Sequence, residues 1–223
     1  MIVVLGVLGI AAYHLLLSYG QQTVSAGAAG VLSNTSPIFT ALLAAVFLGE
    51  HLRAIGWVGI ALAFIGAGMI ATGGNETFRV GFGAAFVLLA ACAWSLYFIG
   101  QKKLLATYAA TDLMTYVIWS GTLVMAFFAP ATVAAVRSAA IEATLAAIYL
   151  GTFPTVVAYI AWAYVLARLP VPIAASALYA TPVLAMVLAW LLLGEIPSVT
   201  MIVGAVVAIS GVVIVNTFGR RSD

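Results

Sequence analysis

Charged residues are scarce in this sequence. Of its 223 residues only 6% are Asp, Glu, Lys or Arg, whereas 65% are hydrophobic and the mean hydropathy is +1.23. Soluble domains carry roughly 25% charged residues, so this chain lacks the charges that would cover a water-facing surface. The shortage excludes a soluble enzyme and a disordered chain, and the net charge of +2 gives no support for a nucleic-acid partner. We therefore expect an all-α integral membrane protein whose surroundings are the lipid bilayer.

Cysteine and intramembrane acids are also nearly absent. Cys92 is the one cysteine, which excludes an intrachain disulfide and a cysteine-based zinc cluster. No Asp, Glu, Lys or Arg lies well inside a hydrophobic stretch, and His14, the one histidine that does, has no G-x-S-x-G partner. Intramembrane proteolysis needs a Ser–His or paired-Asp arrangement, and metal chemistry needs clustered ligands. The sequence therefore predicts no enzyme, no metal site and no cofactor.

Charges and turn residues divide the chain into eight hydrophobic stretches. A helix needs about 20 apolar residues to cross a hydrocarbon core of about 30 Å. Transmembrane β-strands would instead alternate apolar and polar residues, and these stretches do not. We expect transmembrane helices at residues 1–19, 24–48, 54–72, 80–100, 112–133, 143–167, 171–193 and 198–217.

The positions of Lys and Arg predict the orientation. With the C-terminus in the cytoplasm, six basic residues lie inside and two lie outside, which satisfies the positive-inside rule. The six are Arg53, Lys102, Lys103, Arg168, Arg220 and Arg221, and the two are Arg79 and Arg137. Because eight spans are present, the visible N-terminus is also expected in the cytoplasm.

The chain is similar to itself at an offset of 145 residues. The matching pairs include Pro37 with Pro182, Gly49-Glu50 with Gly194-Glu195, Gly59 with Gly204, and Gly66 with Gly211. Equivalent helices are five spans apart, so they cross the membrane in opposite senses, as in inverted-repeat transporters. We expect residues 79–219 to form a complete five-helix repeat and residues 1–73 the last three helices of another. Eight helices of an expected ten would then be visible.

A proline lies in the middle of two of the spans. Proline removes a helical hydrogen bond, and in lipid the freed carbonyl needs a polar neighbour or a water-lined cavity. Polar residues precede each proline, so we expect a cavity wall with the two prolines as hinges. The alternative is a kink that serves packing only, with Ser and Thr bonding back to their own helix. The cavity candidates are Asn34, Ser36, Tyr179 and Thr181, and the hinge candidates are Pro37 and Pro182.

Two Gly-Glu pairs each follow a span. Gly49 and Gly194 predict the left-handed conformation that ends a helix. Glu50 and Glu195 would then stand near the start of the next helix, where the helix dipole favours a negative charge. We expect a structural role at the membrane edge for both glutamates, rather than proton coupling.

Small residues recur at helical spacing in two spans. Gly59-x-x-x-Ala63 and Gly204-x-x-x-Ala208, followed by Gly66 and Gly211, predict seams where helix backbones approach closely. The sequence leaves open whether the seams join parts of one chain or two subunits.

The uncharged spans contain several deep aromatic residues. Missing intramembrane charges argue against phosphorylated substrates, which need Lys or Arg, and leave proton coupling without an obvious carboxylate. His14 matches Tyr159 in the repeat, and it either bonds to a neighbouring helix or carries protons. The aromatic residues either pack together or form an amphipathic lining. The candidates for this lining are Tyr13, His14, Trp94, Tyr97, Tyr159 and Trp162.

The stretch from Pro37 to Glu50, its counterpart from Pro182 to Glu195, and the paired glycines resemble the EamA-type permeases of the drug/metabolite transporter superfamily. The resemblance implies a ten-helix carrier of the inner (plasma) membrane, built of two inverted repeats with both ends cytoplasmic. It implies export of amino acids or related small metabolites, with protons as a candidate coupling ion. It also places the cavity in the spans 1–19, 24–48, 80–100, 143–167 and 171–193. Because two helices of that pattern are missing, the alternative is a truncated membrane subunit that does not transport, and the oligomeric state stays open.

Overall fold

The computed structural model describes residues 1–72, 82–194 and 196–219, and every regular element of these residues is a helix. Eight of the helical stretches are long and apolar enough to cross a membrane. They begin and end within a few residues of the predicted spans. The prediction of an all-α membrane protein with eight visible transmembrane helices is therefore confirmed.

Four of the eight spans are single, uninterrupted helices. They are α5 (Ala54–Thr72), α6 (Gly83–Leu105), α9 (Ile141–Arg168) and α12 (Val199–Phe218). The other four spans consist of shorter segments. They are α1 (Ile2–Gly6), η1 (Val7–Ala12) and α2 (Tyr13–Gly20); α3 (Ala26–Ser33) and α4 (Ser36–Phe47); α7 (Ala110–Met125), η2 (Ala126–Phe128) and α8 (Ala129–Ser138); and α10 (Val171–Ser176), η3 (Ala177–Ala180) and α11 (Thr181–Leu193).

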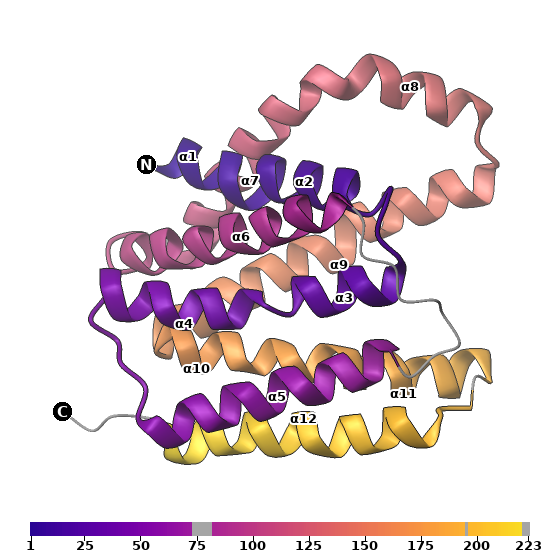
Figure 1. Ribbon diagram of the computed structural model, residues 1–223. Helices are drawn as coiled ribbons and strands as arrows, with labels where there is room; N and C mark the ends of the chain where they lie inside the picture. The colour runs from indigo at the N-terminus through magenta and orange to yellow at the C-terminus, as the bar shows by residue number, and fades with distance from the viewer. Residues whose placement is uncertain (73–81, 195, 220–223) are drawn as a thin grey trace.

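Most helices lie side by side in a bundle, whereas α8 swings away from it (Figure 1). The most extensive helix pair is α5 with α12, and α6 packs between α2 and α4. The backbone N–H of Arg53, just before α5, donates to the carbonyl of Gly219, just after α12, at 3.1 Å. The two helices of the pair therefore run antiparallel.

Glycines make the contact between α5 and α12 possible. A Cβ atom placed on Gly66 would lie 2.5 Å from the carbonyl oxygen of Gly204, and one on Gly211 would lie 2.5 Å from that of Gly59. Only residues without a side chain allow backbones this close. The predicted small-residue seams are confirmed, and in this structure they face each other within one chain.

Each mid-span proline follows an interruption of its helix. We expected kinks inside continuous helices, but Pro37 and Pro182 stand in the first turns of α4 and α11. The α3 helix ends at Ser33, and the η3 segment before α11 is a 3₁₀ turn. A first-turn proline loses no helical hydrogen bond, because the N–H at that position has no partner within the helix. Each span therefore changes from regular α-helix to a turn or a 3₁₀ segment just ahead of its proline, while the backbone stays right-handed.

The two Gly-Glu pairs end helices as expected, but Glu50 has a different partner. Gly49 and Gly194 have φ angles of +69° and +70°, in the left-handed region that glycine adopts readily. Glu50 does not serve the following helix α5. Its carboxylate accepts a hydrogen bond from the backbone N–H of Val171, at the start of α10. Glu195 lies outside the described residues.

The first span and its equivalent in the expected repeat, α9, differ in how much of their surface other helices cover. Leu5 is 3% exposed, whereas Leu150, its equivalent at the offset of 145, is 60% exposed. The helices α6 and α7 pack on the first span and cover Leu5. The matching face of α9 around Leu150 is apolar and exposed in the part of the chain that the structure describes.

Candidate functional site

Trp94 of α6 and five other aromatic residues from three spans form one cluster. The ring centroid of Trp94 lies 4.4 Å from Tyr13, 5.3 Å from Tyr97, 5.0 Å from Phe98 and 6.2 Å from Tyr159. Aromatic pairs at such separations stabilise each other beyond the area that they bury. The cluster therefore holds α2 and α9 against α6 on its two sides.

Helical spacing explains why these side chains share a face. Trp94 and Phe98 are four residues apart on α6, and Ala158 and Trp162 are four apart on α9, so each pair points in one direction. The ring centroids of Phe98 and Trp162 are 4.7 Å apart. Ahead of Tyr13, the first span contains the π-helical segment η1, a feature often found at functional sites.

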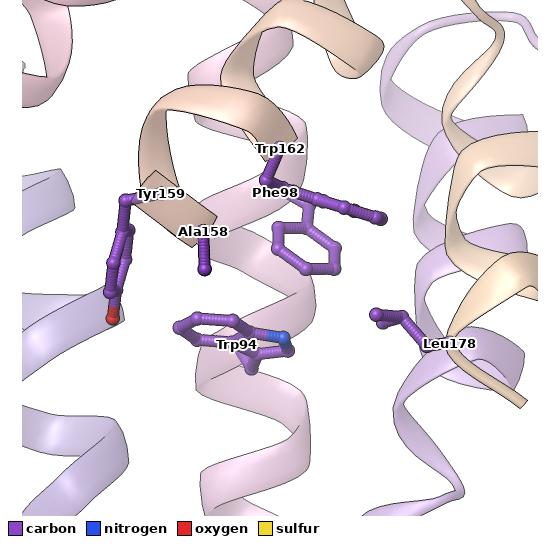
Figure 2. A pocket seen from close by; sticks show the side chains of 6 residues that line it. All are labelled: Trp94, Phe98, Ala158, Tyr159, Trp162 and Leu178. Carbon is purple, nitrogen blue, oxygen red and sulfur yellow. The ribbon is translucent and has the colours of Figure 1, made fainter. Parts of the chain in front are cut away.

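A cavity of about 240 Å³ opens beside this cluster. In Figure 2 the indole of Trp94 lies across from the rings of Phe98 and Trp162, while Leu178 faces them from η3. The wall is almost entirely apolar, and it carries no formal charge. The residues that line it are Trp94, Phe98, Ala158, Tyr159, Trp162 and Leu178.

Three of the predicted aromatic residues line this cavity, and three others surround it. Trp94, Tyr159 and Trp162 belong to the wall. Tyr97 is fully buried behind the wall, where its hydroxyl donates to the sulfur of Met114 at 3.5 Å.

The remaining two predicted residues of this group lie on the first span. Tyr13 packs on Trp94, and His14 contacts Tyr13 edge-on with centroids 5.0 Å apart. His14 is exposed. The structure therefore brings all six aromatic and histidine candidates into one region.

The polar candidates at the two helix breaks do not line this cavity. Tyr179 is fully buried among residues of α5 and α12, including Ile60 and Val215. Asn34 is half-buried, Ser36 is buried and Thr181 is exposed. Their role in binding a substrate stays a prediction.

Sequence reasoning missed Phe98, Ala158 and Leu178. The position of Phe98 four residues after Trp94 was a usable signal, because an i,i+4 pair shares a helix face. Ala158 and Leu178 are common residues whose position against a cavity carries no mark in the sequence.

Side-chain hydroxyls satisfy carbonyls near the breaks. The hydroxyl of Ser95, fully buried on α6, lies 2.9 Å from the carbonyl oxygen of Ser36 and 2.8 Å from that of Ala91. The hydroxyl of Thr35 donates to the carbonyl of Leu32 at 2.6 Å. Broken helices in lipid require such partners, so Ser95 connects α6 to the first turn of α4.

Replacing Ser95 with alanine is expected to lower the free energy of unfolding by about 1 kcal/mol, because the contact with Ser36 is lost. Ser210→Ala is the matched control, since the exposed Ser210 bonds only to Val206 of its own helix. Thermal unfolding of both variants in detergent measures the difference. Equal unfolding temperatures would show that the contact contributes nothing.

Metal ligands are not clustered in the described residues. No group of three or more His, Cys, Asp or Glu in ranges 1–72, 82–194 and 196–219 could hold a metal ion. The side chains around the cavity offer aromatic contacts and a few hydrogen bonds.

Comparison with known proteins identifies the family. The EamA-like transporter family matches residues 1–72 and 81–217. The transporter YdfC of Bacillus subtilis is 41% identical over 95% of this chain and 69% of its own length. A protein of Streptantibioticus cattleyicolor, named a probable terminal-alkyne amino-acid exporter, is 38% identical over 100% of this chain and 75% of its own.

Two further similarities are more distant. A protein of Escherichia coli K12 named a probable amino-acid metabolite efflux pump is 30% identical over 88% of this chain and 69% of its own. A solved crystal structure has the same fold, with a TM-score of 0.76, 19% identity, and coverage of 94% of this chain and 74% of that chain. The eight apolar helices and these matches agree, and this multi-pass membrane protein belongs to the EamA-like transporter family.

Proposed function

We propose that this chain is a secondary active transporter that exports small metabolites, such as amino acids or related compounds, across the inner (plasma) membrane. The observation that carries the proposal is the cavity of about 240 Å³ between α6, α9 and η3. Its volume suits a small molecule, and transporters place such sites within the bilayer between packed helices.

The lining defines the chemistry of the substrate. Indole and phenyl faces attract apolar side chains, while the absence of formal charge on the wall disfavours phosphates. The indole N–H of Trp162 is buried and has no hydrogen-bond partner among the described residues, and a turn of the ring into the cavity would bring it to a polar group of the substrate. A zwitterion with an apolar side chain combines both features. The names of the Streptantibioticus and Escherichia relatives refer to amino-acid compounds, which agrees with this class.

Alternating access is the proposed mechanism, with two inverted repeats moving about the cavity. The pairing of Gly59 with Gly211 and of Gly66 with Gly204 supports it, because the 145-residue offset converts one pair into the other. Such reciprocal contacts are expected at a two-fold axis. The breaks ahead of Pro37 and Pro182 would supply the hinges.

The cytoplasmic side is proposed to be the end of the bundle that carries Arg53, Lys102, Lys103 and Arg168. These four cations lie at the end where α6 and α9 finish and α5 begins, as the positive-inside rule requires. A fluorescent reporter that folds only in the cytoplasm, fused after Asp223, should therefore fluoresce. A dark reporter at normal protein levels would reverse the orientation.

Transport by the purified protein in liposomes tests the proposed function. Labelled amino acids with apolar, aromatic, cationic and acidic side chains should be offered with and without an imposed pH gradient. We expect saturable flux of the apolar and aromatic members, and faster flux with the gradient if protons are coupled. Absence of saturable flux across the panel, with folded protein in the membrane, would contradict the proposal and favour a non-transporting subunit.

A further inference from the structure

A two-residue link joins α9 to α10 at one end of the cavity wall. Leu169 is extended, with φ −112° and ψ 151°, and Pro170 follows with φ −55° and ψ 140°. Proline at position 170 favours this extended residue before it. The link separates Trp162 on α9 from Leu178 on η3, both of which line the cavity. Where the link is held therefore determines how these two wall segments sit against α6.

Lys102 of α6 holds the α9 side of the link. Its ammonium group donates to the carbonyl oxygens of Leu166 and Leu169, each at 2.8 Å. Leu166 lies in the last turn of α9 and Leu169 directly follows it, at a helix end where carbonyls lack helical partners and the dipole favours a cation. The side chain thus ties the end of α9 directly to the end of α6.

Glu50 holds the α10 side of the link. Its Oε2 atom accepts a hydrogen bond of 2.5 Å from the backbone N–H of Val171, the first residue of α10. The left-handed Gly49 turns the chain after α4 and places Glu50 there, and the backbone N–H of Glu50 donates to the carbonyl of Ala44 at 3.2 Å. The carboxylate therefore ties α10 to the end of α4, and the two helices lie side by side in Figure 1.

Apolar packing also holds α9 at this end, through the buried Ala163 and Leu166 and through Trp162 and Val165 beside them. Of its described residues only Ala163 and Leu166 are buried, and the rest are half-buried or exposed. The two charged side chains come from α6 and from the turn after α4, which are separate in sequence from the link they hold. Separation of α9 and α10 from α4 and α6 would have to break both contacts.

We infer that Glu50 and Lys102 are positioning residues that lock the α9–α10 link and close the cavity at this end of the bundle. The inference rests on the proposed transport function. Release of the lock lets α9 and α10 move apart from α4 and α6, which opens the cavity toward the side where α10 begins. Glu50 and Lys102 do not touch the substrate, and they act through the position of the cavity wall.

Cysteine labelling measures the lock directly. In a Cys92→Ala background, Leu178→Cys places one thiol on the cavity wall. A membrane-impermeant maleimide is applied to vesicles that expose the end where α10 begins, identified by the reporter after Asp223. We expect slow labelling of the parent and roughly tenfold faster labelling after Glu50→Ala or Lys102→Met, because each change removes a charge-assisted hydrogen bond.

Two matched controls accompany these variants. Lys103→Met removes the neighbouring charge of α6, whose ammonium lies over the ring of Phe47 at 5.8 Å instead of on α9. Glu195→Ala removes the glutamate that matches Glu50 in the expected repeat. Both should label at the parent rate. If Glu50→Ala does not fold, Glu50→Gln keeps an oxygen for the N–H of Val171 and should give a smaller increase.

The possible outcomes separate the lock from the transport function. Equal labelling of the parent and the Glu50 and Lys102 variants, or an equal increase with Lys103→Met, would overturn the lock. The labelling rate does not depend on finding the right substrate. Absence of flux in the liposome assay would therefore count against transport, whereas unchanged labelling would count against the lock.

Discussion

Replacing Gly66 with leucine is expected to lower the free energy of unfolding by about 3 kcal/mol and the unfolding temperature by roughly 6–12 °C. A Cβ at this position would lie 2.5 Å from the carbonyl oxygen of Gly204 and 2.7 Å from the Cα of Ala208. Both neighbours are backbone atoms of α12, so no change of rotamer can relieve the overlap. The helices α5 and α12 must move apart, and the most extensive helix contact of the molecule is lost.

Gly68 on the same helix provides the control. A Cβ on Gly68 meets no atom within 4 Å, so Gly68→Leu should be neutral or stabilise by up to about 1 kcal/mol through helix propensity. Thermal unfolding of the two variants in the same detergent measures the difference. Similar unfolding temperatures would show that the seam tolerates a side chain.

The expected repeat predicts an equal loss of stability at Gly211. Gly211 stands where Gly66 stands at the offset of 145, and its Cβ would lie 2.5 Å from the carbonyl oxygen of Gly59. Gly211→Leu should therefore destabilise as much as Gly66→Leu. Because both substitutions separate the same two helices, the free energy of unfolding of the double variant should fall by less than the sum of the two single decreases.

The spans could be predicted closely because hydropathy and helix-ending residues mark them. The prediction of 54–72 agrees with Ala54–Thr72, since Gly49 and Arg53 stand before it. The prediction of 80–100 ended too early, because α6 continues to Leu105. Gln101 is fully buried and Lys102 bonds to carbonyls of α9, so polar residues continue the helix where a neighbour satisfies them.

The candidate site could be predicted only in part. The sequence shows how deep a residue lies in its span, but it does not show which neighbouring helix or cavity the side chain faces. Trp94, Tyr159 and Trp162 lie on regular helices, and their depth in the spans already made them candidates for a lining. Tyr179 and its neighbour Leu178 lie on the 3₁₀ segment η3, where a residue turns by roughly 120° rather than 100°. Counting 100° per residue therefore misplaces the side chains of this segment. In the structure Leu178 faces the cavity, while Tyr179 packs against α5 and α12.

The partner of Glu50 is a second feature that the sequence could not predict. Local rules place a glutamate after a helix-ending glycine near the start of the following helix. The structure instead brings Glu50 to Val171, a residue 121 positions away. Which helix start lies closest depends on how α4 and α10 pack, and no local pattern in the sequence contains that information.

Truncating Trp94 to alanine is expected to weaken substrate binding by about 2 kcal/mol, or raise the KM for transport roughly 30-fold. Its indole forms one side of the cavity and contacts rings on α2, α6 and α9. Loss of the indole removes both a face for the substrate and the surface that orders Tyr159. Trp94→Phe keeps an aromatic face, so its KM should rise less than that of Trp94→Ala.

Trp119→Ala is the control for this substitution. Trp119 lies on α7 with 64% of its surface exposed, away from the cavity wall, so its removal should leave the KM unchanged. Initial rates of amino-acid flux in liposomes, measured over a range of substrate concentrations, separate KM from the maximal rate. The unfolding temperature of each variant identifies any loss that comes from misfolding. If Trp94→Ala transports with the KM of Trp119→Ala while both are folded, the aromatic cavity is not where the substrate binds, because a site that depends on these rings cannot lose its central one without a loss of affinity.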